Sequence, residues 1–212
     1  MRNAFATLLL AFSAATATTP VSAYEEPTYE VARKTEAFEI RRYAPYVVVE
    51  TEMRGEYDQA RNDAFRKLFA YIGGANRAQA KLEMTVPVVT EPQPSEKIAM
   101  TVPVMSEPTA RGEQVMQFVL PARFDEQSSP QPTDPQLRVR RVDAQWLAVR
   151  VYSGRASDSN YRENAFELMR ALAAAELTPA GPARFAVYNG PFTPWFLRRN
   201  EVMVPIAGPG AQ

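Results

Sequence analysis

The chain has 212 residues, 46% hydrophobic and 23% charged, a composition that suits one soluble globular domain or at most two small ones. Its 24 basic and 24 acidic residues cancel, so no overall positive field is available to hold nucleic acid, and we expect no nucleic-acid partner. Cysteine and histidine are both absent, which excludes disulfides, thiolate nucleophiles, Cys/His zinc sites and imidazole bases.

The first 23 residues have the pattern of a signal peptide. Arg2 supplies a positive start, Ala4 to Ala15 an apolar stretch, and Val21-Ser22-Ala23 a small-residue cleavage site. A membrane anchor needs about 20 consecutive apolar residues, more than this stretch provides. We therefore expect cleavage after Ala23, an exported protein in the periplasm or outside the cell, no stable membrane insertion, and one monomeric domain over residues 24–212.

An internal repeat organises the remainder of the chain. Residues Phe38 to Gly55 align with Leu137 to Gly154 at an offset of 99, sharing an Arg-Arg pair, the final glycine and the apolar pattern. Two further matches follow in the same order: RNDAF at Arg61 with RENAF at Arg162, and Val102-Pro103-Val104 with Val204-Pro205-Ile206. The simplest interpretation is one unit of strand, strand, helix and strands, used twice.

Alternating apolar residues and β-branched content predict seven strands. They are Tyr46 to Met53, Met84 to Val89, Ile98 to Val104, Gln114 to Leu120, Trp146 to Tyr152, Phe185 to Tyr188 and Val202 to Ile206. The second and third share the string MTVPV and flank the proline-rich segment Glu91 to Ser95, which predicts a hairpin. A proline inside each of these two strands indicates an edge position or a bulge.

Two amphipathic helices are expected, one in each repeat. The first starts near Asp58 and ends at Gly73-Gly74 in a left-handed cap; its apolar stripe is Ala64, Phe65, Leu68, Phe69 and Ile72. The second spans Asn160 to Ala175 after Asp158 or Ser159 as N-cap; its stripe is Tyr161, Ala165, Leu168, Met169 and Leu172. The polar, proline-containing segment 125–135 is the expected connector between the halves.

Four strings occur in order along the chain: YEVARKTEAFEIRRYAPYVVVETEM, KLFAYIGGAN, the two MTVPV strings, and YNGPFTPWFLRRNEVMVPI. With these the chain resembles the SOUL haem-binding proteins. The resemblance implies an α+β fold of two pseudo-symmetric halves, with a twisted or barrel-like antiparallel sheet and two main helices. It also implies a binding protein without a catalytic centre.

The resemblance further implies that haem or another tetrapyrrole binds in an apolar cleft between the first helix and the loop before the last strand. On this sequence the cleft residues are Asn62, Phe65, Leu68 and Phe69 on the helix, and Tyr188, Phe192, Trp195, Phe196, Arg198 and Arg199 in the loop. Histidine, the iron ligand proposed for some members, is absent here, and the helix stripe carries phenylalanines where relatives often have methionines.

The residues themselves lead to a similar expectation. The string PFTPWF followed by Arg198-Arg199 places flat aromatic rings beside two guanidinium groups, which match carboxylates. The alternative is that these aromatics and the helix stripe pack the core, and that the arginines pair with a neighbour such as Glu201. If iron is ligated, tyrosine phenolate and methionine thioether are the available donors. We expect stacking without an iron bond.

Three other functions remain as alternatives. Catalysis lacks support, because the lysines number only four, no serine lies in a G-x-S-x-G elbow, and Asp158, Asn160 and Glu163 lack the glycine of a calcium loop. The proline-rich loops Glu91 to Ser95 and Glu107 to Arg111 could present a surface to a protein partner. A carrier of another hydrophobic small molecule would use the same pocket. We therefore predict neither an enzyme nor a metal site.

Overall fold

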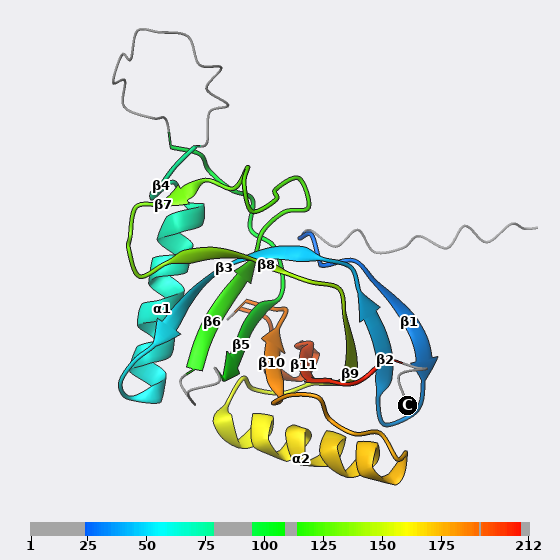
Figure 1. Cartoon of the computed structure of the whole chain (residues 1–212). Helices are drawn as coiled ribbons and strands as arrows, with labels where there is room; N and C mark the ends of the chain where they lie inside the picture. Colours follow the sequence, from blue (N-terminus) through cyan, green and yellow to red (C-terminus); the bar gives the residue numbers. More distant parts are fainter. Residues whose placement is uncertain (1–23, 79–94, 109–113, 191, 209–212) are drawn as a thin grey trace, which may run out of the picture.

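The computed structural model describes residues 24–78, 95–108, 114–190 and 192–208 (Figure 1). Its elements are β1 (Tyr29–Lys34), β2 (Glu39–Tyr43), β3 (Tyr46–Met53), α1 (Tyr57–Ile72), β4 (Asn76–Arg77), β5 (Val104–Pro108), β6 (Gln114–Val119), β7 (Gln131–Pro132), β8 (Arg138–Val142), β9 (Gln145–Tyr152), α2 (Asp158–Ala174), β10 (Arg184–Val187), the short 3-10 helix η1 (Trp195–Leu197) and β11 (Asn200–Pro205). The predicted signal peptide and the first MTVPV strand lie outside the described residues.

Nine strands form one antiparallel sheet in the order β1-β2-β9-β11-β10-β5-β6-β3-β8, and β4 and β7 form a separate pair. Helix α1 packs on β3 and β6, and α2 packs on β9 and β11. Figure 1 shows the sheet curled into a half-barrel with both helices on its outer side. This architecture confirms the predicted α+β class. None of the described helices is long and apolar enough to span a membrane.

The sheet has pseudo-two-fold symmetry. When the edge strand β1 is left out, the two sides of the sheet match from the outside towards the middle. The strands β2-β9-β11-β10 of one side correspond to β8-β3-β6-β5 of the other. The axis passes through the central cross-strand pair of Phe185 on β10 and Ser106 on β5. Because β2 pairs with β9 and β8 pairs with β3, each half lends its first strand to the other. The two-repeat prediction is therefore confirmed, and the halves are interlocked.

Two details of the predicted repeat are wrong. The strings RNDAF and RENAF align at an offset of 101 residues. The buried positions of the two helices instead match at an offset of 100, as in Leu68 with Leu168 and Ile72 with Leu172, so the string alignment is one residue out of register. The strand equivalent to β11 is β6, and β5 is equivalent to β10. The match of Val102-Pro103-Val104 with Val204-Pro205-Ile206 therefore does not reflect equivalent positions.

Most predicted strands are confirmed, with ends within two residues, but the one over Ile98 to Val104 is wrong. The backbone N–H groups of Ile98 and Val102 donate to Ile72 and Glu25, at 2.8 and 3.0 Å, instead of to a neighbouring strand. Pro103 has no N–H to donate. The strand begins only at Val104 and continues to Pro108, through a segment that the sequence pattern left outside the strand.

Both predicted helices are confirmed, with corrections at their ends. Gly73 is right-handed, and Gly74 provides the left-handed residue, with φ of 115°. Ser157 is the N-cap of α2, in place of Asp158 or Ser159, because its side chain accepts from the Asn160 backbone N–H. On each helix part of the predicted stripe is exposed, including Phe69 and Met169. The predicted connector contains turns and β7, which pairs with β4.

The face of the sheet opposite the helices closes on itself. The Gln145 amide on β9 donates to the Tyr46 hydroxyl on β3 at 3.2 Å, although four strands lie between β9 and β3 in the sheet. An apolar cluster that includes Val48, Leu147 and Met203 fills this interior. The curl therefore encloses a third core, separate from the two cores beneath the helices.

A carboxylate of β11 is buried at the edge of this interior core. Glu201 is completely buried and accepts two hydrogen bonds from the Arg41 guanidinium on β2, at 3.0 and 3.1 Å. The Tyr188 hydroxyl and Arg199 also donate to it, at 2.7 and 2.8 Å. Because a buried charge is tolerated only when it is paired and hydrogen-bonded, these donors compensate for the burial of the Glu201 carboxylate.

A second buried carboxylate lies in the other half. Glu50 on β3 accepts from Gln117 at 2.8 Å and from Arg140 at 3.2 Å, and it also pairs with Arg138. Burial opposes ionisation of this carboxyl, but the hydrogen bonds from Arg140, Gln117 and Arg138 outweigh burial and lower its pKa below 4.5. Arg140 is the counterpart of Arg41, 99 residues later in the repeat.

We expect Arg41→Met to lower the free energy of unfolding by about 3 kcal/mol, because it removes one partner of a buried ion pair. The adjacent Arg42 is exposed, so Arg42→Met should change stability by less than about 0.5 kcal/mol. Urea titration of both variants measures the difference. Equal losses in the two variants would contradict the assigned role of the Arg41–Glu201 pair.

Glu50 predicts a specific loss of stability in acid. Because its folded-state pKa lies below its unfolded value, its contribution is complete above about pH 4.5 and is lost as the pH falls through the folded pKa. Glu50→Gln should therefore flatten the dependence of unfolding free energy on pH between about 5 and 2. The control Glu163→Gln, at an exposed position on α2, should keep the wild-type slope.

Candidate functional site

A cavity of about 360 Å³ opens on the helix-bearing face at the pseudo-two-fold axis. It lies over Ser106 and Phe185, the central pair of the sheet. Its walls come from α1, from the strands β3, β5, β6 and β10, from Met100 and Val102 before β5, from Ala156 before α2, and from Tyr188, Asn189, Gly190 and Arg198 beside β11. Both halves of the repeat therefore contribute to one site.

The position of the cavity follows from the packing of the helices. Each helix covers two strands of its own side, which leaves the central strands β5 and β10 without a helix above them. The Arg61 guanidinium on α1 donates to the Ala156 carbonyl at 3.0 Å and so links the start of α1 to the segment that leads into α2. The space between the two helices becomes an enclosed cleft of ligand size.

The lining is mainly apolar and has two charged members. Four methionines line it, at positions 53, 100, 105 and 116, together with Phe65, Phe185 and valines of β5 and β10. The charged members of the lining are Arg61 and Arg198, and the lining contains no carboxylate. An apolar slot with guanidinium groups at its rim suits a flat hydrophobic ligand that carries carboxylates.

The structure brings part of the predicted cleft together. Asn62 and Phe65 from α1, and Tyr188 and Arg198 from the loop, all line the cavity. Phe65 is 37% exposed, and its ring packs edge-on against Phe118 at 5.3 Å. The methionines of the lining were absent from the predicted site. Met53, Met100 and Met116 lie in segments that the sequence pattern predicted as strands, and Met105 directly follows one of these segments.

The other predicted residues lie elsewhere. Leu68 has no exposed surface and belongs to the core beneath α1, as the alternative interpretation expected. Phe69, Trp195 and Phe196 are more than half exposed and do not line this cavity. Phe192 is almost fully exposed; it lines an adjoining hollow that Arg199 and Tyr188 share.

Arg199 is bound to the buried carboxylate of β11. Its Nη2 lies 2.8 Å from Glu201, its Nη1 lies 3.1 Å from Glu26, and its guanidinium carbon lies 3.8 Å above the Tyr188 ring. These contacts match the alternative interpretation, in which the arginine pairs with Glu201. Arg198, one residue earlier, donates to the Thr193 carbonyl at 2.8 Å and faces the cavity.

The donor set of the cavity limits how iron could be held. Burial and the charge of Glu201 raise the pKa of Tyr188 well above 10, and its hydroxyl donates to that carboxylate, so this tyrosine remains a neutral phenol. The methionine thioethers and the phenol of Tyr24, which also lines the cavity, remain as donors. Among the described residues, no group of three or more acidic side chains could hold a metal ion.

We expect Arg199→Met to lower the unfolding free energy by about 2 kcal/mol, because it removes a partner of a buried carboxylate that keeps other donors. Arg155→Met is the control, since Arg155 is exposed in the loop before α2. Thermal and urea unfolding of the two variants test this expectation. Unchanged stability in Arg199→Met would show that Arg41 and Tyr188 alone satisfy Glu201.

Comparison with known proteins agrees with this architecture. The SOUL heme-binding protein family model matches residues 24–97 and 91–205. Heme-binding protein 1 of Xenopus laevis is 26% identical over 167 residues, which cover 78% of this chain and 82% of that protein. Heme-binding protein 1 of Mus musculus is 27% identical over 146 residues, 68% of this chain and 70% of that protein.

A solved structure of a hydrolase from Listeria innocua is also similar, with a TM-score of 0.52 at 10% sequence identity. The match covers 79% of this chain and 91% of that one. At so low an identity the likeness shows a shared fold and carries no information about chemistry.

Proposed function

The chain belongs to the SOUL heme-binding protein family, and on this basis we propose that it binds haem or a related tetrapyrrole in the cavity at the pseudo-two-fold axis. The observation that carries the proposal is the lining, which is apolar and has Arg61 and Arg198 as its charged members. The names of its relatives support the same class of ligand. The protein acts as a binding protein without a catalytic step.

In this proposal the macrocycle lies against the apolar wall of the cavity. Phe65 supplies a flat surface on α1, and Met100, Met116 and Phe185 supply contacts from the sheet side. The ligand carboxylates extend towards Arg61 and Arg198, whose guanidinium groups match carboxylates in geometry. The ligand would then contact both halves of the repeat.

Binding in this site does not depend on an iron bond. Haem iron, when bound, would find the thioethers of the lining methionines and the phenol of Tyr24 as the available donors, because histidine is absent and Tyr188 donates to Glu201. Apolar contact and charge pairing are sufficient for micromolar affinity, which corresponds to about 8 kcal/mol.

Titration with haemin and with metal-free protoporphyrin tests the proposal. We expect saturable binding of both, with dissociation constants that agree within about threefold, because the same contact area and arginines serve both ligands. Absorbance of the Soret band and fluorescence of the porphyrin follow the two titrations. Binding of neither ligand would contradict the proposal and leave another hydrophobic acid, or a protein partner, as the ligand. A strong preference for haemin would contradict the iron-independent mode alone.

Matched variants locate the ligand. Phe65→Ala should weaken protoporphyrin binding about tenfold through lost apolar contact, whereas Phe166→Ala, from the similar string on α2, should leave it unchanged. Arg61→Glu should weaken binding about tenfold at low salt and less at high salt, whereas Arg66→Glu, at an exposed position of the same helix, should not. Melting temperatures of the same samples control for stability. Intact affinity in folded Phe65→Ala and Arg61→Glu would remove this cavity as the site.

A further inference from the structure

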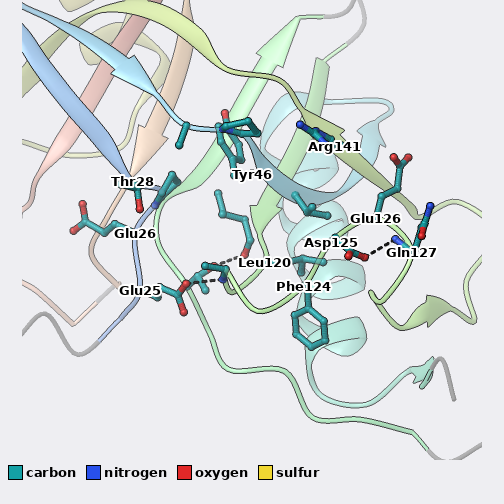
Figure 2. Close-up of a pocket in the computed structure, with 17 residues that line it drawn as sticks. Glu25, Glu26, Thr28, Tyr46, Leu120, Phe124, Asp125, Glu126, Gln127 and Arg141 are labelled. Carbon is teal, nitrogen blue, oxygen red and sulfur yellow. Dashed lines mark hydrogen bonds between the residues drawn. The ribbon is translucent and has the colours of Figure 1, made fainter. Parts of the chain in front are cut away.

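A second cavity, of about 570 Å³, lies at the turn between β2 and β3 (Figure 2). One wall is the N-terminal segment Glu25 to Thr28, and the opposite wall is the chain that leaves β6, from Leu120 to Gln127. Apolar side chains that include Val47, Leu120 and Phe124 line it. Its lining shares no residue with the cavity at the axis.

The pseudo-two-fold axis identifies the matching place in the other half. The Leu120 N–H donates to the Val47 carbonyl at 2.8 Å, and the Ile206 N–H donates to the Trp146 carbonyl at 3.1 Å. Val47 and Trp146 also lie 99 residues apart, at the offset that relates β3 to β9. The pseudo-two-fold axis therefore relates Val47, which lines this cavity, to Trp146 in the other half.

In the second half that place is filled. A Cβ atom added to Gly208 would lie 2.5 Å from the indole Nε1 of Trp146, so the backbone at Gly208 closes directly over the ring. Gly208 follows Ile206 by two residues, as Ala122 follows Leu120, and Ala122 lines the cavity. Val47 is smaller than Trp146, and in the first half the cavity of about 570 Å³ lies beside it.

The charged groups around the cavity are mostly acidic. Its lining contains four carboxylates, those of Glu25, Glu26, Asp125 and Glu126, and one guanidinium, that of Arg141 (Figure 2). Glu26 pairs with Arg199, and Arg141 lies 3.3 Å from Asp143, which is not part of the lining. Carboxylates outnumber guanidinium groups in the lining by four to one, so the rim of this cavity is negative, opposite in sign to the arginine rim at the axis.

Backbone groups hold Glu25 and Asp125 in place. The Ala122 N–H donates to the Glu25 carboxylate at 2.6 Å, and the Gln127 and Ser128 N–H groups donate to Asp125 at 2.9 and 2.6 Å. These two acidic side chains are therefore fixed beside the apolar part of the lining.

We propose that this cavity is a second ligand site, which takes a flat aromatic cation in the volume that Trp146 fills in the other half. The ring would lie over Val47 and Leu120, with its positive charge towards Glu25, Asp125 and Glu126. The site is independent of the tetrapyrrole proposal, because the two cavities differ in lining, in position and in the sign of their charge.

Fluorescence titration with proflavine, a planar tricyclic cation, tests the proposal, with anthracene-2-sulfonate as a tricyclic anion of similar shape. We expect saturable binding of one proflavine per chain, weaker binding of the sulfonate, and no displacement of proflavine by excess protoporphyrin. Absence of proflavine binding, equal affinity for the anion, or displacement by protoporphyrin would each overturn the proposal.

Two variants place the probe in the cavity. Val47→Trp should abolish proflavine binding by filling the ring volume, as Trp146 does in the other half. Glu126→Lys, an exposed change that leaves the apolar wall intact, should weaken binding about fivefold, and Glu163→Lys on α2 should leave it unchanged. If Val47→Trp does not fold, Glu126→Lys decides; unchanged affinity in that variant would overturn the proposal. Protoporphyrin affinity should be wild type in the Glu126→Lys and Glu163→Lys proteins.

Discussion

The burial of Glu201 is the constraint on which the shape of this protein depends. Its main partner, Arg41, lies on β2, and β9 separates β2 from β11, so the guanidinium must reach across an intervening strand on the inner face of the sheet. In the other half Arg140 on β8 pairs with Glu50 on the adjacent strand β3 and also reaches Glu107 on β5, across β3 and β6. A curled sheet keeps these charges paired and out of water. The outer face is then left for two separate helices, and the gap between them becomes the candidate site.

The few identities within the repeat have physical reasons that the structure makes visible. Arg41 and Arg140 each bind a buried carboxylate, although the two carboxylates are on different strands. Gly55 and Gly154 both have positive φ, 99° and 125°, where residues with a Cβ are strained. The second arginine of each Arg-Arg pair, Arg42 in the first repeat and Arg141 in the second, is exposed, and nothing in the structure explains this identity. Most other positions needed only to remain apolar. The two repeats therefore share their pattern of apolar residues although few of their residues are identical.

Periodicity in the sequence was enough to predict both helices and the strands β3, β6, β9, β10 and β11, because each of those signals lies within one short window. The candidate site is different, since its walls come from segments on both sides of the axis, and no window contains them together. Adjacent side chains also point in different directions, because they alternate along an extended segment. Arg198 lines the cavity, whereas Arg199 pairs with Glu201. Sequence alone could not separate those two arginines, nor recognise the methionines of the central strands as a wall.

A ligand on a two-fold axis meets nearly the same backbone from either side, which has a consequence for how a planar molecule is oriented. If the side chains were symmetric as well, a ligand and its flipped form would bind with equal free energy, and the complex would be a mixture. The helix register equates Arg61 with Tyr161 and Phe65 with Ala165, so the guanidinium and the phenyl ring that α1 contributes to the lining have no like counterparts at the equivalent positions of α2. The duplication thus accounts for the place of the cavity. The difference between the halves at these two positions would give a planar ligand and its flipped form unequal binding free energies.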